Sequence, residues 1–240
     1  MSEAGVTVRS VLVLWDVDHT LIENSGINKE TYARAFELLT GNRAEYPALT
    51  EGRTEPEIMR NMLLTHGIDE WETYRARVPK VLEAATSENA SRLRERGYVL
   101  PGAREVLALL QGTRGIVQST LSGNLRPNAF TKLSIFGLDV YLDFEVGGYG
   151  SDDDVRANLV GIARERASSK YGTVFDERTT VLIGDTLRDV QAGRNGGAYV
   201  IAIASGSDSV EKLRDKGADE VFADLRDTRS VVGAVTNLQR

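Results

Sequence analysis

Short apolar runs alternate with segments of helical spacing along most of the chain, and this alternation limits the possible folds more than any other feature. Apolar strands that alternate with helices are typical of a parallel sheet covered by helices on both faces. The sequence therefore predicts an α/β fold built on a doubly wound, Rossmann-like parallel sheet. The expected strands are 8–15, 115–120, 140–146, 179–184, 198–204 and 219–224, and the expected helices are 102–112, 125–136, 153–168, 187–196, 208–216 and 226–238.

One long stretch, from about residue 24 to residue 98, interrupts the alternation. Its apolar residues recur at helical spacing, and Thr54 followed three residues later by Glu57 is typical of a helix start. We therefore expect an all-helical second domain, inserted directly after the first strand. The predicted boundaries are 1–22 and 98–240 for the α/β core domain and 23–97 for the helical domain.

Composition excludes several classes of protein. The net charge is −6, without a basic cluster, so nucleic acid is not an expected partner. The chain has no cysteine, which excludes disulfides, thiolate metal sites and a cysteine nucleophile. The N-terminal residues show no signal-peptide pattern, and no apolar run approaches the roughly 20 residues of a membrane span. We expect a cytoplasmic protein without a membrane partner; the sequence leaves its oligomeric state open.

Polar residues stand at the C-terminal ends of three expected strands: Asp16 and Asp18 after the first, Ser122, Gly123 and Asn124 after the second, and Asp185 after the fourth. Ligands of an open parallel sheet collect in the crevice beyond these ends. Several carboxylates in one crevice repel one another, and each resists ionisation unless a cation neutralises them. Oxygen ligands without cysteine favour a hard cation, most simply Mg²⁺.

The same crevice can bind phosphate. Ser122 offers a hydroxyl, and Gly123 and Asn124 offer backbone N–H groups at the start of the following helix. One carboxylate can attack phosphorus to form an aspartyl phosphate, while a second holds a proton for the leaving oxygen. Both Asp16 and Asp18 must reach the substrate, and we expect the chain to leave the strand at Val17.

Three short segments make the chain recognisable. The segments DVDHTL (16–21), LSGN (121–124) and GDTLRD (184–189) resemble, in order and spacing, three motifs of the haloacid dehalogenase superfamily of phosphohydrolases. The inserted helices resemble its α-helical cap, as in the phosphoglycolate-phosphatase-like and β-phosphoglucomutase-like branches. This resemblance covers nearly the whole chain. It implies a Mg²⁺-dependent phosphatase that acts on a small phosphorylated metabolite through an aspartyl phosphate.

The resemblance also implies roles for individual residues. Asp16 would be the nucleophile, and Asp18 would be first the general acid and then the general base. Asp16 and Asp185 would bind Mg²⁺ through their side chains, and Asp18 through its backbone carbonyl. Asp189 would support the metal directly or through water. Ser122 would bind the phosphate.

Two positions depart from the family pattern. His19 stands where the family usually has glycine; it could narrow the entrance or be a bystander. The lysine expected ahead of the last motif is absent, since that region has no lysine before Lys170, and Arg156 is the candidate substitute. Arg53, beside a glycine turn in the insertion, is a candidate for binding the distal part of the substrate. For both arginines an exposed surface role is the alternative.

Three other functions stay open at this point. A phosphomutase would use the same aspartyl phosphate but return the phosphoryl group to a sugar. A non-catalytic phosphate-ester-binding protein would keep the pocket without turnover. A response-regulator-like receiver domain also gathers aspartates at strand ends, but the length of the chain and the helical insertion disfavour it.

Overall fold

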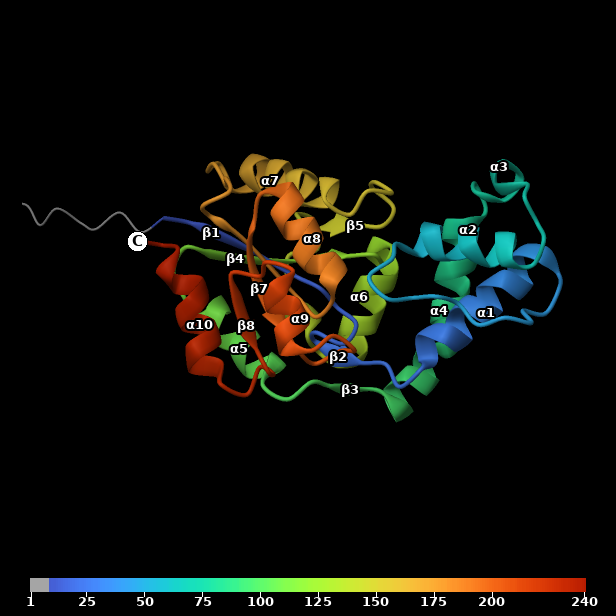
Figure 1. Ribbon diagram of the computed structural model, residues 1–240, viewed down its shortest axis with the longest axis horizontal. Helices are drawn as coiled ribbons and strands as arrows, with labels where there is room; N and C mark the ends of the chain where they lie inside the picture. The colour runs from blue at the N-terminus through green and yellow to red at the C-terminus, as the bar shows by residue number, and fades with distance from the viewer. Residues whose placement is uncertain (1–8) are drawn as a thin grey trace, which may run out of the picture.

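The computed structural model describes residues 9–240, and its centre is a six-stranded parallel sheet (Figure 1). The strand order is β5-β4-β1-β6-β7-β8, so the chain winds outward from β1 in one direction and then in the other. The predicted doubly wound α/β fold is therefore confirmed. In chain order the elements are β1 (Val11–Trp15), β2 (Ile22–Glu23), α1 (Ile27–Thr40), α2 (Glu55–Thr65), α3 (Trp71–Tyr74), α4 (Val78–Arg96), β3 (Tyr98–Val99), α5 (Ala103–Gln111), β4 (Ile116–Ser122), α6 (Arg126–Ile135), the 3₁₀ helix η1 (Asp139–Tyr141), β5 (Gly148–Tyr149), α7 (Asn158–Tyr171), β6 (Thr180–Gly184), α8 (Leu187–Gly196), β7 (Tyr199–Ile203), α9 (Val210–Asp215), β8 (Glu220–Phe222) and α10 (Thr228–Asn237).

Helices cover both faces of the sheet, as Figure 1 shows. Successive side chains of a strand point to opposite faces, so β1, which is wholly buried, contributes to two apolar layers. Val11, Val13 and Trp15 pack with residues of α5, α6 and α10. Leu12 and Leu14 pack on the other face, with residues of α7 and α8. The continuous apolar run in the sequence thus has a direct cause, because both faces of β1 lie against helices.

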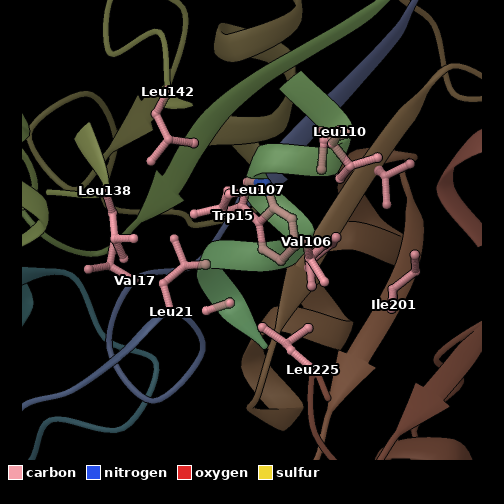
Figure 2. Close-up of a cluster of buried hydrophobic side chains, with 14 of the residues drawn as sticks. Trp15, Val17, Leu21, Val106, Leu107, Leu110, Leu138, Leu142, Ile201 and Leu225 are labelled. Atoms are coloured by element: carbon pink, nitrogen blue, oxygen red, sulfur yellow. The ribbon is translucent and has the colours of Figure 1, made fainter. Parts of the chain in front are cut away.

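Trp15, the last residue of β1, anchors the larger of these two layers. It is fully buried and lies beside Val106 and Leu107 of α5 (Figure 2). Its indole Nε1 donates a hydrogen bond to Gln118 Oε1 of β4, at 3.2 Å. The carboxylate that follows Trp15 in the chain therefore stands on a strand end held by both packing and hydrogen bonding.

The helical insertion, α1 to α4, leaves and rejoins the sheet through two adjacent segments (Figure 1). These segments, β2 and β3, pair antiparallel, with Ile22 opposite Val99. The insertion has an apolar cluster of its own, which also includes Leu125, just before α6. The division into a core domain (1–22 and 98–240) and a helical domain (23–97) remains a proposal. Among the described residues, no helix is both long and apolar enough to span a bilayer.

Two expectations about the α/β part are wrong. The strand expected at 140–146 is instead the 3₁₀ helix η1 followed by a loop. Its apolar residues Leu142, Phe144 and Val146 are buried, which explains the alternating pattern, but the neighbouring strand β5 begins only at Gly148. The helix expected at 153–168 begins at Asn158, because turns occupy the residues before it.

We predict that Trp15→Phe lowers the free energy of unfolding by about 2–4 kcal/mol, because it opens a cavity and leaves Gln118 Oε1 without its donor. Urea denaturation measures the change. Val174→Ala, at a side chain that is 80% exposed, is the control and should change stability by less than about 0.5 kcal/mol. A loss in Trp15→Phe no larger than that of the control would contradict the prediction.

Candidate functional site

The strand order brings three polar strand ends together. Asp16 follows β1, Ser122 ends β4, and Asp185 follows β6, and these are three neighbouring strands of the sheet. The carboxyl ends of parallel strands at such a switch point form a crevice. Here the crevice is a cavity of about 450 Å³. All predicted site residues except Asp189 line it: Asp16, Asp18, Arg53, Ser122, Gly123, Asn124, Arg156 and Asp185.

Three carboxylates form a buried cluster at the base of this crevice. Asp16, Asp185 and Asp189 each have a carboxylate oxygen within 4.8 Å of the others, and they are 7%, 2% and 1% exposed. Asp185 Oδ1 accepts a hydrogen bond from Thr20 Oγ1, and Asp189 Oδ2 accepts from the Thr186 N–H and hydroxyl. Carboxylate oxygens gathered in this way are suitable ligands for a hard divalent cation.

Arg156 supplies positive charge to this cluster. It lies in the turn before α7, and its side chain is 9% exposed. Its Nη2 donates to Asp16 Oδ1 at 2.7 Å and also to Asp189 Oδ1. The structure therefore places Arg156 beside the predicted nucleophile, where the sequence predicted a substitute for the missing lysine. One guanidinium cannot balance three carboxylates, so the cluster retains excess negative charge.

Asp18 lies beside a different cation, Lys132 of α6, which the sequence analysis missed. Lys132 Nζ lies 2.8 Å from Asp18 Oδ2. Asn124 Nδ2 donates to the same oxygen at 3.1 Å, and Asn24 Nδ2 donates to Asp18 Oδ1 at 3.2 Å. One signal was available: Asn128 and Lys132 are four residues apart in the expected helix 125–136 and so share a face with its buried apolar residues.

The two neighbouring aspartates have opposite pKa shifts. Burial raises the pKa of Asp16 to about 7, with a further increase from Asp189 and a partial offset from Arg156. Burial also acts to raise the pKa of Asp18, but the charge and hydrogen bond of Lys132, together with hydrogen bonds from Asn124 and Asn28, outweigh it and lower that pKa to about 2. Without a cation, Asp16 therefore holds a proton up to neutral pH, and Asp18 is ionised. A divalent cation at the cluster would favour the ionised form of Asp16 instead.

The start of α6, expected to bind phosphate, already interacts with a carboxylate of the insertion. Glu55, the first residue of α2, is 1% exposed, and its Oε2 accepts hydrogen bonds from the Leu125 N–H and from Asn128 Nδ2, both at 2.8 Å. The Glu55 N–H donates to the Gly123 carbonyl at 2.7 Å. A Cβ at Gly123 would collide with the Arg53 carbonyl, so only glycine allows this approach. Glu55 is a second residue that the sequence analysis missed.

His19 has a backbone conformation that explains the usual glycine at this position. Its φ is +62°, in the left-handed region that glycine adopts at little cost. Its side chain lines the cavity and is 42% exposed, and its Nδ1 lies 2.8 Å from Glu23 Oε2. His19 is therefore at the cavity wall, but it contacts Glu23 rather than a predicted catalytic residue.

Arg53 reaches the cavity from the insertion side, as predicted, but it is already paired. Its Nε lies 3.3 Å from Glu57 Oε1, and its Nη1 lies 3.9 Å from Glu51 Oε2. The side chain is 21% exposed, so it is neither free in solvent nor fully buried. Its position fits contact with the distal part of a ligand, and that role remains a proposal.

Comparisons with known proteins address the family and the fold of the chain. Residues 13–194 match the sequence model of one protein family, haloacid dehalogenase-like hydrolase. None of the curated proteins compared with the chain matches its sequence.

Several solved structures share the fold. A hydrolase from Pseudomonas syringae is 19% identical, with a TM-score of 0.65 over 95% of this chain and 99% of that one. A predicted phosphatase from Clostridium acetobutylicum is 16% identical, with a TM-score of 0.67 over 94% and 99%. A predicted phosphoglycolate phosphatase from Haemophilus somnus is 15% identical, with a TM-score of 0.65 over 95% and 99%. At these identities the likeness shows the fold alone.

We predict that, without divalent cations, the protein loses stability as the pH rises from about 4 to about 7. Asp16 has a pKa of about 7 in the folded chain and an ordinary value of 3.8, so between these values the folded state binds more protons and stability falls with rising pH. Asp16→Asn removes this contribution. The free energy of unfolding should therefore decrease between pH 4 and pH 7 by at least about 1 kcal/mol less in Asp16→Asn than in the wild type. Urea denaturation at pH 4, 5, 6, 7 and 8 measures this difference.

Added Mg²⁺ should stabilise the wild type most at the high end of this pH range, where it competes with the fewest protons. Parallel stability curves for wild type and Asp16→Asn would contradict the prediction.

Proposed function

Because the chain belongs to the haloacid dehalogenase-like hydrolases, we propose that it is a Mg²⁺-dependent phosphatase that acts on a small phosphorylated metabolite through an aspartyl phosphate. One observation carries the proposal: Asp16, Asp185 and Asp189 lie together, buried, near the ends of the neighbouring strands β1 and β6 and beside a cavity. With all three carboxylates ionised, such a cluster needs a cation to neutralise it. Phosphate transfer is the chemistry in which that cation and a carboxylate nucleophile work together.

The residues present fit Mg²⁺. Asp16 and Asp185 would bind it through side-chain oxygens, and Asp18 through its backbone carbonyl. Both oxygens of Asp189 already accept hydrogen bonds, from Arg156 and Thr186, which favours support through water over direct contact. When bound, Mg²⁺ supplies positive charge that keeps the nucleophile ionised and neutralises phosphate oxygens.

The protein's own groups perform the two displacements. Asp16 attacks phosphorus through a carboxylate oxygen, the bond to the ester oxygen breaks, and Asp18 gives a proton to that oxygen. Asp18 then takes a proton from water as the water oxygen attacks phosphorus and releases phosphate from Asp16. Ser122 donates its hydroxyl to the phosphate, and Arg156 adds charge beside the attacking oxygen.

The helical insertion is proposed to act as a cap. Its residues Asn24, Asn28, Tyr32 and Arg53 line the same cavity as Asp16 and Asp185 and would form the wall around a leaving group. Closing a site in this way excludes bulk water and so strengthens the electrostatic interactions inside.

The cavity lining also limits the leaving group. Among the residues that line it there is no aliphatic side chain, and the one aromatic ring other than His19 belongs to Tyr32. A nucleobase, aryl or acyl chain would find no aliphatic side chain to pack against, whereas hydroxyl and carboxyl groups would find hydrogen-bond donors. We therefore propose a small, hydrophilic phosphate ester as substrate.

We predict that the purified protein releases phosphate from hydrophilic phosphate monoesters when Mg²⁺ is present, and that Asp16→Asn lowers kcat by at least about 1,000-fold, because an amide cannot form the covalent intermediate. Phosphate release from a panel of esters, with Mg²⁺ or with EDTA, measures this. Asp69→Asn, at an exposed aspartate outside the cavity, is the matched control and should keep wild-type activity.

Equal rates for wild type and Asp16→Asn would contradict the mechanism. Isomerised product from a sugar phosphate, formed with an added bisphosphate and without net phosphate release, would show a phosphomutase instead. Tight binding of esters with no turnover would show a binding protein.

A further inference from the structure

Lys132 is a buried cation to which the proposed mechanism gives no role. Its side chain is 4% exposed, and its Nζ lies 2.8 Å from Asp18 Oδ2 and 2.6 Å from Asn124 Oδ1. Lysine is rarely buried unless its charge is paired. Lys132 does not line the cavity, although Asp18 and Asn124 both do. It therefore acts on a ligand only through the residues that it contacts.

The contact with Asn124 fixes the orientation of an amide. A lysine ammonium only donates hydrogen bonds, so the Asn124 oxygen must face Lys132 and the NH₂ group must face away from it. That NH₂ group donates to Asp18 Oδ2 at 3.1 Å and to Ser122 Oγ at 2.6 Å. A single ammonium group thus contacts the proposed acid–base carboxylate and orients an amide that donates to the same carboxylate.

The position of Lys132 is itself fixed by packing. Asn128, Ala129, Lys132 and Leu133 form the buried face of α6, which packs against α4 of the insertion. One helical turn before Lys132, Asn128 donates to Glu55 of α2. The ammonium group is therefore held by an element that contacts both the sheet and the insertion.

We propose that Lys132 is a positioning residue for proton transfer: it orients Asp18 toward the leaving oxygen, directly and through the Asn124 amide that donates to the same carboxylate oxygen. The inference rests on the phosphatase function proposed above. In this proposal Lys132 does not contact the phosphate. Arg156 differs in this respect, because it lines the cavity beside Asp16.

The test compares two esters that differ in their need for a proton. The alkoxide that leaves an alkyl phosphate needs the proton of Asp18, whereas 4-nitrophenolate leaves without one. Lys132→Met should lower kcat/KM for the best alkyl phosphate by about 100-fold, in the range that general acid catalysis contributes, and for 4-nitrophenyl phosphate by less than about 10-fold. KM for both esters should stay within about threefold of the wild-type value, because no phosphate contact is lost.

Two further variants complete the comparison. Lys132→Arg, which keeps the charge in a different shape, should recover part of the lost activity on the alkyl ester. Lys212→Met, at an exposed lysine of α9, should match the wild type on both esters. If Lys132→Met does not fold, Lys132→Gln keeps a donor without the charge and should show the same difference between the esters.

An equal loss on both esters with a raised KM would overturn the proposal in favour of a phosphate-binding role, and unchanged kinetics would overturn it as well. A wild type without turnover would instead refute the proposed function. A crystal structure of Lys132→Met gives a readout that needs no turnover. We expect the Asn124 amide to turn away from Asp18 there, and unchanged Asp18 and Asn124 side chains would contradict the inference.

Discussion

Mutual repulsion among buried carboxylates is the constraint on which the rest of the structure depends. The strand order places the ends of β1 and β6 side by side, and the residues that follow are Asp16 and Asp185, with Asp189 one helical turn later. Three buried carboxylates within 4.8 Å are costly to ionise together. The protein offers Arg156 as partial compensation, and the remaining negative charge is what suits the site to a divalent cation and a phosphate ester.

Two buried cationic side chains lie beside different aspartates of the site. Arg156 contacts Asp16 and Asp189, and Lys132 contacts Asp18. Burial keeps Asp16 protonated despite Arg156, and Lys132 keeps Asp18 ionised despite burial, with pKa values of about 7 and about 2. This is the reverse of the order that catalysis needs, since the nucleophile must be ionised and the acid protonated. Cation and phosphate would correct both, because positive charge favours ionised Asp16 and the phosphate's negative charge favours protonated Asp18.

Local patterns in the sequence predicted the sheet and the residues at its strand ends, because a buried strand and the polar residues that follow it are adjacent in the chain. The same reasoning failed at 140–146, where the alternating apolar residues are buried although they belong to a 3₁₀ helix and a loop and not to a strand of the sheet. It also missed Lys132 and Glu55, whose partners lie 114 and 70 residues away in the chain. Such contacts depend on how α6 and α2 pack, which no local pattern specifies. The positive φ of His19 could have been expected from the glycine usual at its position, and the contact with Glu23 could not.

Binding of Mn²⁺, as a paramagnetic substitute for Mg²⁺, tests most directly whether the carboxylate cluster is a cation site. Electron paramagnetic resonance of the free ion gives the affinity of the wild type and of Asp185→Asn, with Asp69→Asn as the control for removal of a charge elsewhere. We expect Asp185→Asn to bind Mn²⁺ at least about tenfold more weakly than the wild type, and Asp69→Asn to bind it equally well. Equal affinity in the wild type and Asp185→Asn would show that the cluster does not hold the cation.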